Sequence, residues 1–74
     1  MAYKLTVDVI PADGDWPRDV EVQHVFYGDS PREVENIFAR HAAGCEFLGP
    51  AIRERRVNTE LEEIDDDERP SYDD

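Results

Sequence analysis

Three side chains in this sequence are of the types that hold soft metal ions or form a nucleophile–base pair: His24, His41 and Cys45. His41 and Cys45 are four residues apart, and this spacing puts two side chains on the same side of a helix end. His24 belongs to an alternating segment whose apolar face we expect the same helix to cover, so the three side chains can converge. Imidazole nitrogen and thiolate sulfur are typical zinc ligands, and a Cys beside a His is also the basis of nucleophilic catalysis.

The ordinary interpretation of these three residues is structural. A histidine on an apolar face usually hydrogen-bonds a backbone carbonyl, and a free cysteine is commonly buried as a small hydrophobic side chain. The sequence contains no second cysteine, no glycine elbow and no oxyanion motif beside Cys45. We therefore predict no catalytic residues, no cofactor and no enzymatic activity. His24, His41 and Cys45 remain the candidates if a metal is bound.

The segment from Ser30 to Gly44 predicts the helix that carries His41. Ser30 is a good N-cap, Pro31 suits the first helical position, and Glu33 completes a capping box. Gly44 is the predicted C-terminal stop. One apolar stripe recurs at helical spacing and is expected to be buried: Val34, Ile37, Phe38, His41 and Ala42.

Alternating polar and apolar residues predict strands at residues 3–10, 19–27 and 54–62. The first two should form an antiparallel hairpin through a turn at Asp13-Gly14. Trp16 in that turn either folds back as a lid on the core or serves as a binding anchor, and the lid is the more usual role. The order ββαβ indicates an α+β domain at residues 1–64, with a small antiparallel sheet and one helix packed on one face.

The charge of the chain is strongly acidic and unevenly distributed. The formal net charge is −11; residues 1–59 carry ten acids and seven bases, and residues 60–74 carry nine acids and one base. Such a balance disfavours direct nucleic-acid binding and docking on anionic membranes. The basic cluster at residues 53–56, at the start of the predicted third strand, is expected to form ion pairs. A single cysteine and the absence of an apolar leader predict a cytoplasmic location.

Residues 65–74 form a predicted disordered acidic tail. Such a tail either solvates the domain or docks on a basic partner as a short peptide. Together with Trp16, the candidate interaction residues are Asp65, Asp66, Asp67, Glu68 and Tyr72.

Three phrases of this chain resemble small, uncharacterised proteins encoded by phages of actinobacteria. They are HVFYGDSPRE at residues 24–33, HAAGCEFLGPAI at residues 41–52 and LEEIDDD at residues 61–67. The resemblance covers about residues 20–68. It implies a phage accessory protein acting in the host cytoplasm, and no active residue is carried over from it.

The absent catalytic set, the nearly neutral body and the segregated acidic tail favour a non-enzymatic protein-interaction module. Its expected partner is a protein with a basic surface. The most specific form of this hypothesis is that the module inhibits a host protein that binds nucleic acid. Two alternatives remain open. One is a structural or assembly protein that forms a homodimer through an open sheet edge. The other is a small metal-binding domain that uses His24, His41 and Cys45.

Overall fold

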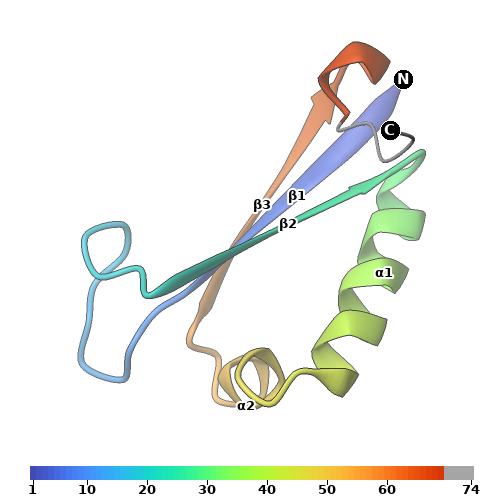
Figure 1. Ribbon diagram of the computed structural model, residues 1–74. Helices are drawn as coiled ribbons and strands as arrows, with labels where there is room; N and C mark the ends of the chain where they lie inside the picture. The colour runs from blue at the N-terminus through green and yellow to red at the C-terminus, as the bar shows by residue number, and fades with distance from the viewer. Residues whose placement is uncertain (70–74) are drawn as a thin grey trace, which may run out of the picture.

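An antiparallel hairpin begins the chain in the computed structural model, which describes residues 1–69 (Figure 1). Strand β1 (Ala2–Val9) pairs with β2 (Val22–Gly28), and its other edge pairs with β3 (Val57–Ile64), also antiparallel. The strand order β2-β1-β3 makes β1 the central strand. Because side chains alternate along a strand, the register puts Val7 and His24 on the same face of the sheet, as neighbours on paired strands.

Helix α1 (Pro31–Gly44) lies across the face of the sheet that β1 and β2 form (Figure 1). The predicted start is confirmed, because the Ser30 hydroxyl accepts a hydrogen bond from the Glu33 amide at 3.1 Å and Pro31 opens the helix. The helix also ends at Gly44, as predicted. Gly44 is itself the last helical residue, and the C-cap is Cys45 in an extended conformation.

The hydrophobic core lies between α1, the sheet and a second helix, and Val7, Val34 and Leu48 are its largest fully buried side chains. The predicted stripe of α1 faces this core, but unevenly. Val34 and Ala42 are buried, whereas Ile37 and Phe38 are only partly buried. His41, predicted to lie on the buried stripe, is exposed at its margin.

The second helix, α2 (Leu48–Arg53), changes the predicted order ββαβ to ββααβ. The pair Gly49-Pro50 is typical of a turn, but both residues are in the first turn of α2. Proline is tolerated there because the N–H groups of the first turn lack helical partners. The basic cluster therefore ends this helix instead of forming a strand. β3 begins at Val57, three residues later than predicted.

Helix α2 ends in a Schellman motif. The Arg56 amide donates to the Ala51 carbonyl at 2.8 Å, and the Arg55 amide donates to the Ile52 carbonyl at 3.0 Å. The motif requires a left-handed residue at the position that Arg55 occupies, and its φ is 59°. Glycine is the usual residue at this position, which explains why the sequence gives little warning of the helix end.

The connection between β1 and β2 is a loop over residues 10–21, longer than the predicted strand bounds leave. A turn does form at the predicted place, where the Gly14 amide donates to the Pro11 carbonyl at 3.1 Å. Trp16 folds back from this loop, and its indole Nε1 donates to the Asp8 carboxylate at 2.7 Å. Asp8 is 6% exposed and also accepts from the Gln23 side chain at 2.9 Å. Trp16 thus covers a buried carboxylate on the face of the sheet opposite α1, while 45% of its own surface stays exposed.

After β3, the chain forms a turn of 3-10 helix, η1 (Asp66–Glu68), where the sequence analysis expects a disordered segment. Two reciprocal hydrogen bonds hold it: the Glu68 amide donates to the Asp65 backbone carbonyl at 3.0 Å, and the Asp65 amide donates to the Glu68 carboxylate at 3.2 Å. Arg69 then forms an ion pair with Asp29 at the β2–α1 turn. Within residues 1–69, no helix has the length and apolar character needed to cross a bilayer.

Candidate functional site

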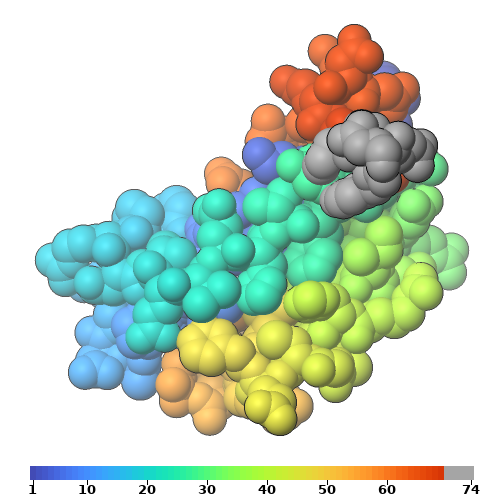
Figure 2. All heavy atoms as spheres, in the orientation of Figure 1, coloured from blue at the N-terminus to red at the C-terminus, as the bar shows by residue number. Residues whose placement is uncertain are grey.

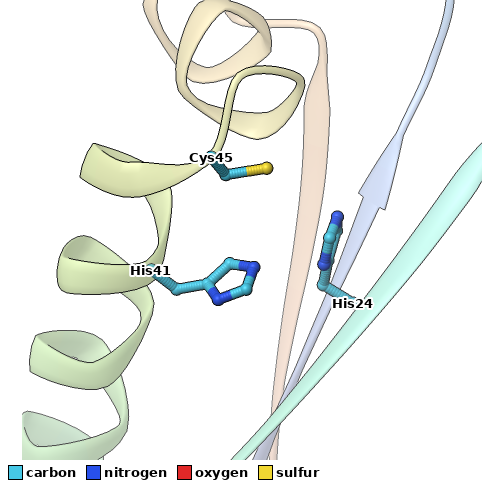
Figure 3. A group of neighbouring side chains, drawn as sticks. All are labelled: His24, His41 and Cys45. Atoms are coloured by element: carbon cyan, nitrogen blue, oxygen red, sulfur yellow. The ribbon is translucent and has the colours of Figure 1, made fainter.

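The fold brings together the three candidate metal ligands of the sequence. One ligand atom from each of His24, His41 and Cys45 lies within 4.8 Å of those of the other two. Figure 3 shows the side chains converging on the space between α1 and the sheet, with His41 turning a ring nitrogen toward His24. The sequence shows only that the three side chains can converge, and the structure shows that they do.

Each of the three residues is held by a different element. His24 projects from β2, beside the fully buried Val7 of the central strand. His41 comes from the last turn of α1, and Cys45 is the cap of that helix. The two imidazole centroids are 5.3 Å apart, and the Phe26 ring lies 5.3 Å from His41 in an edge-on arrangement. Both imidazoles therefore pack on the same aromatic ring, that of Phe26.

The environment of His24 disfavours the protonated form of its imidazole. Burial disfavours the charged form and is the main cause that lowers the pKa of His24 below 6.5; the nearby His41 lowers this pKa further. The Nε2 atom of His24 is buried and has no hydrogen-bond partner within residues 1–69. A buried polar nitrogen without a partner is costly, at about 1–3 kcal/mol, so this atom calls for an explanation.

Cys45 is half-buried, and its thiol sulfur has a defined role in the α1–α2 connection. The Leu48 amide donates a hydrogen bond to the Cys45 Sγ at 3.2 Å, and the Gly49 amide donates to the Cys45 carbonyl at 3.2 Å. The sulfur thus accepts a hydrogen bond, as the sulfur of a metal-bound thiolate can also do. The backbone amide of Leu48 orients it from outside the cluster.

A second feature is an acidic surface on β3 and η1. Seven acidic side chains, all exposed, define what we call the acidic ribbon: Glu60, Glu62, Glu63, Asp65, Asp66, Asp67 and Glu68. No basic residue interrupts residues 60–68. In the described chain its polar contacts include the Tyr3 hydroxyl at 3.3 Å from Glu63 and the N-terminal amine at 3.7 Å from Asp66. The ribbon reaches the end of the molecule remote from the β1–β2 loop (Figure 2).

A groove of about 380 Å³ lies between the start of the β1–β2 loop and α2. Its walls include apolar groups from Val9, Pro11 and Phe47, and three glutamates line it: Glu21, Glu46 and Glu54. Glu54 is already paired with Arg56. Sequence reasoning missed this groove, because the helix that forms one wall was not predicted and its lining residues are scattered along the chain.

The predicted interaction residues are divided by the structure. Asp65, Asp66, Asp67 and Glu68 are exposed in the acidic ribbon, and Trp16 is a partly exposed lid over Asp8. Trp16 and the four acidic residues therefore do not form one site. Tyr72 lies outside the described residues.

Comparison of the chain with protein-family models, with curated proteins and with solved structures finds no match. The function is therefore argued from the residues of this chain.

Proposed function

We propose that this protein is a non-enzymatic protein-interaction module that binds a partner with a basic surface. The acidic ribbon is the observation that carries the proposal. Its seven carboxylates are exposed, follow one another along an edge strand and turn, and lie on a folded scaffold. Concentrated charge of one sign destabilises a small domain through self-repulsion, so its placement on one ordered edge favours a role in binding.

The ribbon would act mainly on the rate of encounter. Charges beyond about 8 Å are screened at physiological ionic strength, but a row of like charges raises the local concentration of a basic partner within that distance. Specific fit would come from shaped surfaces such as the groove beside α2. Its apolar wall at Phe47 and the carboxylates of Glu21 and Glu46 suit the long apolar stem and charged end of an arginine or lysine side chain.

The resemblance to phage proteins suggests where such a partner is found. A phage accessory protein acts in the host cytoplasm, and host proteins that bind nucleic acid carry the basic surfaces that an acidic ribbon would complement. The proposed activity is the binding and inhibition of such a host protein.

The test compares two variants of equal charge. The ribbon variant carries Glu60→Gln, Glu62→Gln and Asp66→Asn; the control carries three changes at exposed acids elsewhere: Asp13→Asn, Asp15→Asn and Glu35→Gln. A partner captured from actinobacterial lysate by the wild-type chain is then measured by surface plasmon resonance at two salt concentrations. We expect the ribbon variant to associate at least several-fold more slowly, with a weaker salt dependence, while the control stays close to wild type. Equal effects of the two variants would contradict the proposal.

A second candidate function is self-association through the sheet. The outer edge of β2 pairs with no other strand in the described chain, and Val25 of that strand is 37% exposed on the sheet face opposite α1. The acidic edge of β3 disfavours pairing there, so the β2 edge is the proposed interface. Light scattering after size-exclusion chromatography would show a dimer that Val25→Lys disrupts. A monomer over the whole accessible concentration range excludes this candidate.

A further inference from the structure

The strongest unassigned feature of the molecule is the His24–His41–Cys45 cluster, which is separate from the acidic ribbon and from the groove. Three donor atoms, from β2, the end of α1 and its cap, lie within 4.8 Å of one another. We infer that these side chains form a binding site for Zn²⁺ or a closely similar divalent ion, and that the ion ties α1 to the sheet.

The distances require only a small closure. Three atoms that all lie within 4.8 Å of one another share a point no farther than about 2.8 Å from each of them. Zinc bonds are about 2.0–2.1 Å to imidazole nitrogen and about 2.3 Å to cysteine sulfur. Each ligand atom would therefore move inward by roughly 0.5–0.8 Å, which side-chain rotation can supply.

The donor set selects the class of ion. Two imidazole nitrogens and one sulfur suit a borderline-soft ion and do not suit Mg²⁺ or Ca²⁺, which take oxygen ligands. Three protein ligands leave the fourth tetrahedral position to water, and His41 is exposed, so solvent reaches the cluster from its side. The proposed centre is therefore an open zinc site with one solvent ligand.

Two details of the structure fit a ligand role better than simple packing. The buried Nε2 of His24 lacks a hydrogen-bond partner in the part of the chain that the structure describes, although buried polar atoms normally have one. The sulfur of Cys45 accepts a hydrogen bond from the Leu48 amide, which is the kind of outer contact that orients a metal-bound thiolate.

The ion would contribute directly to folding. The core is small, and the contacts between α1 and the sheet are formed mainly with β2. A bond from His24 to the ion and from the ion to His41 and Cys45 would link residues 17 to 21 positions apart. Because the unfolded chain does not hold the three donors together, binding free energy appears as folding stability.

The test uses the full chain, stripped of metal with a chelator, with Zn²⁺ and Co²⁺ as probes. Isothermal titration should give one Zn²⁺ per chain. Co²⁺ should produce a thiolate-to-cobalt charge-transfer band together with intense visible bands of tetrahedral geometry. At free zinc about 100-fold above the dissociation constant, the melting temperature should rise by about 10 °C or more.

Conservative variants assign the ligands. Cys45→Ser should abolish the charge-transfer band, and Cys45→Ser and His41→Gln should each weaken zinc binding at least tenfold, roughly the smallest loss seen even for outer contacts of a metal site. His41 is exposed, so His41→Gln tests the site without disturbing the core. The ribbon variant with Glu60→Gln, Glu62→Gln and Asp66→Asn is the matched control and should bind zinc as the wild type does.

Several results would overturn the inference. The first is the absence of stoichiometric zinc binding by the wild-type chain. The second is zinc binding that survives Cys45→Ser with less than a tenfold loss. The third is zinc binding that the ribbon variant abolishes, because the metal would then be held by surface carboxylates. Circular dichroism of each variant distinguishes lost binding from lost folding, and a folded His41→Gln variant with unchanged affinity also refutes the site.

Discussion

Glycine at position 55 should make this protein more stable than alanine at the same position, although glycine is usually harmful inside a helix. Arg55 holds the left-handed position of the Schellman motif at φ 59°, and residues with a Cβ adopt that conformation at a cost of about 1–2 kcal/mol. Glycine removes this cost but loses about 0.5–1 kcal/mol through the greater freedom of its unfolded chain. The arginine charge near a helix C-terminus is also lost in the exchange.

The decisive comparison is therefore Arg55→Gly against Arg55→Ala, because both variants lose the same charge. We expect the glycine variant to be more stable than the alanine variant by about 1 kcal/mol, or about 4–8 °C in melting temperature for a domain of this size. Urea unfolding followed by circular dichroism measures the difference. The two hydrogen bonds of the motif, at 2.8 and 3.0 Å, persist in both variants because they use only backbone atoms.

The same pair of substitutions at Arg53 provides the control. Arg53 is the last helical residue of α2, so Arg53→Ala should be more stable than Arg53→Gly, by at most about 1 kcal/mol. The sign of the Gly–Ala difference thus reverses over two residues. An alanine variant at Arg55 that equals or exceeds the glycine variant would refute the left-handed assignment and the Schellman motif with it.

Two further predictions concern buried polar groups. Trp16→Phe removes the donor to buried Asp8 and should cost about 1–3 kcal/mol in urea unfolding; in an Asp8→Val background the same change should cost less, and equal costs would contradict the coupling. The pKa of His24 is lower in the folded chain than in the unfolded chain, so the unfolded chain binds a proton at His24 at a higher pH than the folded chain does. Stability should therefore fall as pH drops below about 6.5. With chelator present, the loss between pH 7.5 and 5.5 should be smaller in His24→Gln; His41 and Cys45 face His24 and are unchanged. Parallel losses would contradict the assignment.

Much of the architecture follows from local patterns. The Ser30 cap, Pro31 and the apolar stripe predict α1 because capping and helical periodicity act within a few residues. The alternation in the first strand likewise predicts β1 and its pairing with β2. The residues that determine these elements are close together in the chain, so the sequence is sufficient to predict them.

Helix α2 was not predictable in the same way. Its six residues include Gly49 and Pro50, which read locally as a turn, and a helix this short has no periodicity to detect. Burial of Leu48 in the core accompanies its formation, and the end of the helix depends on a left-handed Arg55 where sequence rules look for glycine. Tertiary packing outweighed local preference at this point of the chain.

The sequence by itself determined which side chains can bind a metal, where the acidic residues lie along the chain, and that one helix covers the sheet. Only the tertiary structure decided that His24 meets His41 and Cys45, and that the acids from residue 60 onward lie along an ordered edge. The reason is physical: residue type and local spacing set chemistry and helix or strand preference. The distance between residues far apart in sequence is set by strand register and by the packing of the helices on the sheet.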